Sequence, residues 1–122
     1  MANFVINQMS PQLSVTAVDS AIKFYTQKLG FELDFLYGDF YAGIIKGGNS
    51  IHLKLTDRTK LPEKHTDDSP IAIQFAVTGI ERLYEEFCAC GVQIVQPLRQ
   101  MSYGKEFYIT DVDENVLAFL ET

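Results

Sequence analysis

The same order of elements occurs twice along this chain of 122 residues. An alternating, strand-like segment opens each half, at Gln12–Val18 and again at Ile71–Val77, and an amphipathic segment follows each of them and ends at a glycine, Gly30 or Gly91. Three strand-like runs then complete each half. An internal repeat constrains a fold strongly, because each copy must build the same supersecondary unit. The sequence therefore predicts an α+β fold of tandem βαβββ modules.

We expect one domain, residues 1–122, with repeats over about 10–56 and 70–121 and a polar linker between them, Asp57–Ser69. The net charge is −6 and the ten Lys and Arg residues are scattered. Nucleic-acid binding needs clustered cations to neutralise phosphates, so we expect no nucleic-acid partner. No apolar run approaches the roughly 18 residues of a membrane span, and the N-terminus lacks a basic leader region. The prediction is a cytoplasmic protein without a membrane partner.

Capping signals delimit two helices. The first is predicted over Ser20–Leu29 with Asp19 as its N-cap. The second is predicted to begin at a capping box, in which Thr78 and Glu81 satisfy each other's backbone amides. Cys88 falls in the apolar stripe of this second helix, so we expect it to pack in the core.

Alternation along the strands separates a core face from a free face. In the fourth strand Ile51 and Leu53 share an apolar face, which leaves His52 and Lys54 opposite. The first strand buries Leu13 and Val15 and leaves Gln12, and the fifth strand similarly leaves Gln74 between Ile73 and Phe75. The free faces are not needed for the core. They are therefore the candidate ligand surface.

Four segments resemble one known family across nearly the whole chain. They are Pro11-x-Leu-x-Val15, Phe24-Tyr-Thr-x-Lys-Leu-Gly-Phe31, Gly47-Gly-x-x-Ile-His-Leu53 and Phe107-x-Ile-Thr-Asp-x-Asp-x-Asn115. This pattern is similar to that of the glyoxalase/bleomycin resistance/extradiol dioxygenase superfamily, also called the vicinal oxygen chelate superfamily. Usual members have Pro and Gly where this chain has Val112 and Glu114. The resemblance implies paired βαβββ modules that form a curled mixed sheet around a central cavity, often completed by a second subunit.

The resemblance also implies where a metal would bind in the family's enzymes. The corresponding positions here are Ser10, Lys54 (or His52 if the register slips by two), Ala72 and Ala118. Alanine cannot ligate a metal, serine is a poor ligand, and a lysine ammonium repels a cation. A catalytic metal normally needs three protein ligands, and one histidine cannot supply them. We therefore expect no metal and no other cofactor.

What remains resembles the metal-free, bleomycin-resistance-like branch of the superfamily. That branch implies a protein that binds a small molecule and sequesters an antibiotic or another aromatic or cationic compound, without catalytic residues. A homodimer is expected, because open sheet edges and a half-open cup need covering. The expected ligand-binding residues are the free-face polar groups and nearby aromatics, namely Gln12, Tyr41, His52, Lys54, Gln74 and Tyr103.

Two alternatives stay open. One is a glyoxalase- or dioxygenase-like enzyme that binds a metal at residues other than the family's usual ligands, or uses His52 for acid–base chemistry in its accessible pKa range. The other is a scaffold whose surface binds another protein. Elemental analysis separates metal enzymes from binding proteins, and a ligand screen separates small-molecule binding from protein binding.

Overall fold

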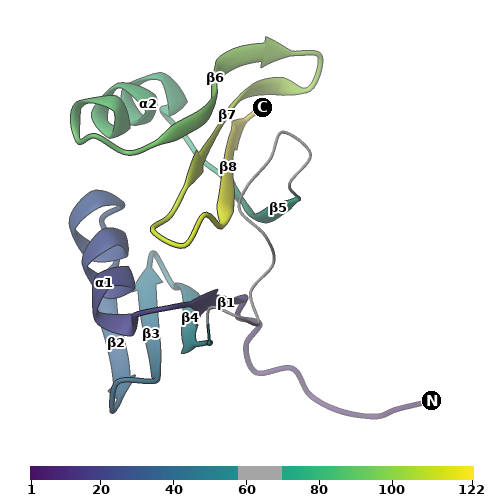
Figure 1. Cartoon of the computed structure of the whole chain (residues 1–122). Helices are drawn as coiled ribbons and strands as arrows, with labels where there is room; N and C mark the ends of the chain where they lie inside the picture. The colour runs from purple at the N-terminus through teal and green to yellow at the C-terminus, as the bar shows by residue number, and fades with distance from the viewer. Residues whose placement is uncertain (58–69) are drawn as a thin grey trace.

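The computed structural model describes residues 1–57 and 70–122 (Figure 1). The first half contains β1 (Gln12–Val15), α1 (Val18–Lys23) with a π-helical turn after it (Phe24–Lys28), β2 (Glu32–Tyr37), β3 (Tyr41–Lys46) and β4 (Asn49–Leu55). The second contains β5 (Ile71–Ala76), α2 (Ile80–Ala89), β6 (Ile94–Met101), β7 (Gly104–Thr110) and β8 (Val116–Glu121). Of the linker expected between them, 58–69 lies outside the described residues. None of the helices described here is long and apolar enough to cross a membrane.

Each half folds into one four-stranded mixed sheet. The strand orders are β1-β4-β3-β2 and β5-β8-β7-β6. The pairs β1–β4 and β5–β8 are parallel, and all other neighbouring strands are antiparallel. Figure 1 shows α1 beside the first sheet and α2 beside the second, on the same side of the molecule. The predicted α+β fold of tandem βαβββ modules is confirmed. Within one chain the modules build two separate, open sheets.

The apolar faces of both sheets and both helices share one core. Leu53 in the first module and Leu117 in the second have no exposed surface. The predicted alternation holds for β1 and for most of β4, although Leu55 at the end of β4 is 38% exposed. On the edge strand β5 the apolar residues are less buried: Ile71 is 41% exposed, and Ile73 and Phe75 line a cavity rather than the closed core. The core faces therefore point away from the polar faces considered below.

Hydrogen bonds between the two most family-like segments join the modules. The buried Tyr25 hydroxyl donates to Asp111 Oδ2 over 2.7 Å, and burial together with this carboxylate raises the pKa of Tyr25. Asp113 Oδ1 accepts from both the amide and the hydroxyl of Thr16, at 3.2 and 2.6 Å. Asn115 Nδ2 donates to the carbonyl of Ser14 over 3.3 Å. The Asp111–Asn115 turn thus fixes the second sheet against the start of the first module.

The predicted helix caps are wrong, and a tertiary contact replaces the cap of α2. Helix α1 begins after Ala17 without a side-chain cap, and Asp19 lies inside its first turn. Helix α2 begins after Gly79, which adopts a left-handed conformation with φ of 82° and also has no side-chain cap of its own. Instead Glu121 Oε1, from the end of β8, accepts the amides of Gly79 and Ile80 at 3.1 and 3.0 Å.

The expectation for Cys88 is also wrong. Its side chain is exposed, whereas its neighbour Phe87 is buried and stacks edge-on against Phe107 and Phe119. Phe87, with Tyr84 one turn earlier, makes the contact with Phe107 on the sheet. Cys88 lies one position further round the helix and faces solvent.

Candidate functional site

The free faces of the two sheets are built from rows of residues that pair across the strands. Residues that pair directly share a face of a sheet. On the first sheet the rows are Gln12–His52–Gly43–Phe35 and Ser14–Lys54–Tyr41–Tyr37. On the second sheet they are Gln74–Ala118–Tyr108–Gln96 and Ala76–Leu120–Glu106–Arg99.

An aromatic cluster, formed by Phe35, Tyr37, Tyr41 and His52, covers the free face of the first sheet. The ring of Phe35 lies 5.2 Å from that of His52, 5.5 Å from Tyr37 and 5.8 Å from Tyr41, measured between centroids. Phe35 lies directly over Gly43, and a Cβ atom at that position would overlap with the ring. A glycine in the middle of β3 therefore makes room for the cluster.

A chain of hydrogen bonds orients the polar edge of the cluster. Gln12 Nε2 donates to the Tyr41 hydroxyl at 3.4 Å, and this hydroxyl lies 2.6 Å from His52 Nδ1. The Tyr41 hydroxyl has two acceptor lone pairs, so it can accept from both Gln12 and His52 or donate to Nδ1, and the tautomer of His52 decides between the two. Lys54, exposed and paired with Tyr41 across the strands, adds a positive charge.

A carboxylate network, formed by Arg99, Tyr103, Glu106 and Tyr108, occupies the free face of the second sheet. Glu106 is only 5% exposed. Its carboxylate accepts from Arg99 Nε at 2.8 Å, from the Tyr103 hydroxyl at 2.7 Å and from the Tyr108 hydroxyl at 3.2 Å. The Arg99 guanidinium also lies over the Tyr108 ring, 5.7 Å from its centroid.

The network holds Glu106 in its charged form. Burial alone would raise the pKa of Glu106, but the hydrogen bonds from Tyr103, Arg99 and Tyr108 outweigh burial and lower it. The same hydrogen bond to Glu106 raises the pKa of Tyr103, and the contact with Glu106 raises that of Arg99. The negative charge of Glu106 is therefore already compensated by Arg99.

The residues expected to bind a ligand divide between the two sheets. Gln12, Tyr41 and His52 are brought together by hydrogen bonds on the first sheet, beside Lys54. Tyr103 belongs to the carboxylate network, and Gln74 is exposed on the edge strand β5. Whether these six side chains contact one ligand stays a prediction.

The expected set of ligand-binding residues lacks five members of these two clusters: Phe35, Tyr37, Arg99, Glu106 and Tyr108. Alternation placed Glu106 opposite the buried Phe107 but gave no sign of its partners. Phe35 and Arg99 follow register shifts in β2 and β6, and a bulge changes the face on which later residues lie. The Gly43 position is the one available signal for Phe35, since glycine inside a strand often marks a close approach.

The positions that correspond to the family's metal ligands offer poor donors here. Ser10 precedes β1, and its hydroxyl accepts a hydrogen bond from Gln8 at 2.7 Å. Ala72 and Ala118 lie on the second sheet and have no ligating atoms. Among the residues that the structure describes, no group of three or more His, Cys, Asp or Glu side chains is placed to hold a metal ion.

The sequence matches the model of the Glyoxalase/Bleomycin resistance protein/Dioxygenase superfamily over residues 6–119. The chain belongs to this superfamily. The resemblance noted in the sequence is thereby confirmed. No curated protein matches the chain significantly by sequence.

Several solved structures share the fold along nearly the entire chain. The bleomycin-binding protein of Streptomyces verticillus, solved with copper(II)-bleomycin, is 24% identical, with a TM-score of 0.74 and coverage of 100% of this chain and 99% of that one. TioX from Micromonospora sp. ML1 is 18% identical (TM-score 0.77, coverage 94% and 98%). The fosfomycin resistance protein FosX from Listeria monocytogenes is 16% identical (TM-score 0.76, coverage 98% and 95%). These likenesses show the common fold.

Proposed function

We propose that this protein is a metal-free small-molecule-binding protein that sequesters an aromatic compound, such as an antibiotic, on the free faces of its sheets. The observation that carries the proposal is the aromatic cluster: Phe35, Tyr37, Tyr41 and His52 gather on the face that the core does not use. Aromatic side chains stack on flat ligands and provide large contact areas. Two solved relatives, a bleomycin-binding protein and a fosfomycin resistance protein, are consistent with such a role.

The polar groups favour an aromatic ligand with hydrogen-bond acceptors over a purely cationic one. The two rows that carry the aromatic cluster contain Lys54 and His52 and no acidic residue, while Glu32 lies in the next row, paired with Ile45. On the second sheet, Glu106 is already paired with Arg99 over 2.5 Å. The Lys54 ammonium would donate to acceptor atoms on a ligand that stacks on the cluster, and the His52 ring nitrogen that does not face Tyr41 would add a second polar contact.

Binding without a metal can be tested directly. We expect elemental analysis of the gel-filtered protein to find no stoichiometric zinc, nickel, manganese or iron, because alanine and serine occupy the family's ligand positions. A screen of planar aromatic compounds, bleomycin included, by thermal shift should identify binders that raise the melting temperature. One retained metal ion per chain would overturn the metal-free proposal. A screen without any binder would favour the scaffold alternative instead.

The hydrogen-bonded chain from Gln12 through Tyr41 to His52 supports one second candidate. A histidine whose ring is held in place by a hydrogen bond is also suited to acid–base catalysis. In that case a compound from the screen would be chemically changed rather than released intact. Mass spectrometry of each binder after incubation separates the two candidates, because sequestration predicts recovery of the unmodified compound.

We further propose that the functional unit is a homodimer located in the cytoplasm. The strands β1 and β5 each have a neighbour on one side only, and exposed edges favour pairing with another chain. A second copy would also cover the free faces and turn each into a cup. Light scattering at high micromolar concentration should give the mass of a dimer, and a monomer mass would overturn this proposal.

A further inference from the structure

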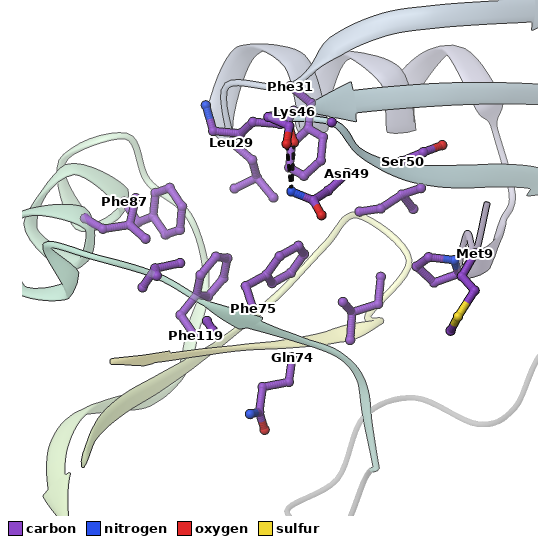
Figure 2. A pocket seen from close by; sticks show the side chains of 18 residues that line it. Met9, Leu29, Phe31, Lys46, Asn49, Ser50, Gln74, Phe75, Phe87 and Phe119 are labelled. Carbon is purple, nitrogen blue, oxygen red and sulfur yellow. Dashed lines mark hydrogen bonds between the residues drawn. The ribbon is translucent and has the colours of Figure 1, made fainter. Parts of the chain in front are cut away.

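A cavity of about 650 Å³ lies between the two modules, at their common junction (Figure 2). This volume falls within the range of typical ligand sites. The first module contributes the end of its helical segment and the hairpin between β3 and β4, and the second contributes β5, α2 and β8. Apolar side chains dominate the lining, chiefly Leu29, Phe31, Phe75, Leu83, Phe87 and Phe119.

This junction cavity is separate from the proposed ligand faces. None of the residues of the aromatic cluster or of the carboxylate network lines it. Gln74 contributes only by its place in β5, because its side chain points away from the cavity (Figure 2). A ligand here would therefore contact the core side of the sheets.

One polar atom is fixed at the cavity. Asn49 Nδ2 donates to the carbonyls of Lys46 and Gly47, both at 3.2 Å. Two carbonyl partners fix the amide orientation, since only the NH₂ group can donate to them. Asn49 Oδ1 is then left without a partner among the described residues and points into the cavity, as Figure 2 shows.

The two other polar side chains nearby, Lys46 and Ser50, do not present a hydrogen-bond acceptor to the cavity. The Lys46 ammonium lies at the rim, where it donates to the carbonyl of Gly30 over 3.3 Å. The buried Ser50 hydroxyl has no partner either, but Figure 2 shows it directed away from the cavity. A bound molecule thus meets aromatic rings on several sides and, at the mouth of the cavity, the exposed Asn49 acceptor and the Lys46 ammonium.

We propose that the junction cavity binds a neutral aromatic molecule that carries one N–H or O–H donor. The ring would lie among Phe31, Phe75 and Phe119, whose edges and faces suit stacked or edge-on partners. The donor would be directed at Asn49 Oδ1. The Lys46 ammonium lies only at the rim, where it already donates to Gly30, and a charged group placed among the rings would lose its hydration without a partner. This site is independent of the proposed ligand faces.

Indole and 1-methylindole provide a matched pair of probes, because the second lacks the N–H donor and keeps the ring. The protein contains no tryptophan, so indole fluorescence reports binding directly. We expect a blue shift of indole emission on titration, and about fivefold weaker binding of 1-methylindole, as one net hydrogen bond implies. Equal affinity of the two probes, or no binding of indole, would overturn the proposal.

Two variants locate the bound probe. Asn49→Leu removes the acceptor at similar volume and should abolish the preference for indole over 1-methylindole, whereas Asn7→Leu on the exposed N-terminal segment should keep it. Leu83→Phe narrows the cavity and should weaken both probes several-fold, whereas Leu33→Phe on the exposed side of β2 should not. Circular dichroism melts confirm that each variant folds. A preference for indole that survives in Asn49→Leu would contradict the proposed contact.

Discussion

The two modules share one backbone plan, and their free faces carry opposite chemistry. Corresponding row positions hold His52 and Ala118, Gly43 and Tyr108, Phe35 and Gln96, Tyr41 and Glu106, and Tyr37 and Arg99. The first face is an aromatic surface with donors directed outwards. The second is a compensated ion pair shielded by tyrosines. The repeat therefore specifies the scaffold, and the chemistry of each face is set independently of it.

The substitutions with the largest expected effect test whether the core faces of the two sheets contribute equally to stability, although their free faces differ. Leu53→Ala in β4 and Leu117→Ala in β8 each remove a side chain with no exposed surface. We expect each to lower the free energy of unfolding by about 2–5 kcal/mol, as truncation of buried leucine does. Denaturant melts measure this loss. Gln74→Ala, on the free face of β5, serves as the control and should cost less than about 1 kcal/mol. If Gln74→Ala destabilises as much as Leu53→Ala, the assignment of faces is wrong.

The carboxylate network should contribute to stability in a pH-dependent way. Glu106→Gln removes the charge that Arg99, Tyr103 and Tyr108 contact, and we expect a loss of about 1–3 kcal/mol at neutral pH. Because folding lowers the pKa of Glu106, its contribution is present above the ordinary carboxyl pKa of 4.5 and is lost as pH falls through the lowered value. Chemical denaturation of both proteins across this range measures the difference.

The difference between wild type and Glu106→Gln should therefore shrink in acid. Tyr37→Phe is the matched change at the position of the first module that corresponds to Arg99, and its effect on stability should not depend on pH in this range, because Tyr37 pairs with Tyr41 and contacts Phe35 rather than a charged group. A stability difference for Glu106→Gln that stays constant as the solution is acidified would show that the charge is not what the network stabilises.

The sequence predicted the architecture because the repeat, the glycine positions and the strand alternation are local signals. Gly30 and Gly91 do adopt positive φ, at 78° and 76°, where the helical segments end. The caps could not be predicted in the same way. The acceptor for the start of α2 is Glu121, which lies 41 residues further along the chain than Ile80, and no local pattern indicates such a contact.

The N-termini of the two helices also differ between the modules, and we expect a smaller effect on stability there. The N-terminus of α2 is satisfied by Glu121 Oε1, and these backbone donors lower the pKa of Glu121. Helix α1 has no side-chain cap, and Asp19 contacts only the amide of Ser20. Glu121→Ala should therefore lower the melting temperature more than Asp19→Ala does. Equal shifts in calorimetry would mean that the cap from β8 adds nothing beyond a charge near the helix end.

The candidate site was only partly readable from the sequence. Gln12, Tyr41, His52 and Lys54 follow from regular alternation in β1, β3 and β4, which pair without a shift. Phe35 and Arg99 lie beyond bulges, where counting by two fails. The separation of the expected residues onto two sheets also depends on how the modules pack. That arrangement is set by contacts such as Tyr25 to Asp111, far apart in sequence.

Two substitutions on the free face of the first sheet should change stability the least and ligand binding the most. Tyr41→Phe removes the hydroxyl that orients His52, and Lys54→Gln removes an exposed charge, so each should change the free energy of unfolding by less than about 1 kcal/mol. For an aromatic binder from the thermal-shift screen, each should weaken binding by about tenfold, as the loss of roughly 1.4 kcal/mol of hydrogen bonding implies. Titration calorimetry measures the affinities. Lys23→Gln, an exposed lysine on α1, is the control for the charge and should bind like wild type. If Tyr41→Phe and Lys54→Gln also bind like wild type, the ligand does not lie on the aromatic cluster, and the first face loses the role that sets it apart from the second.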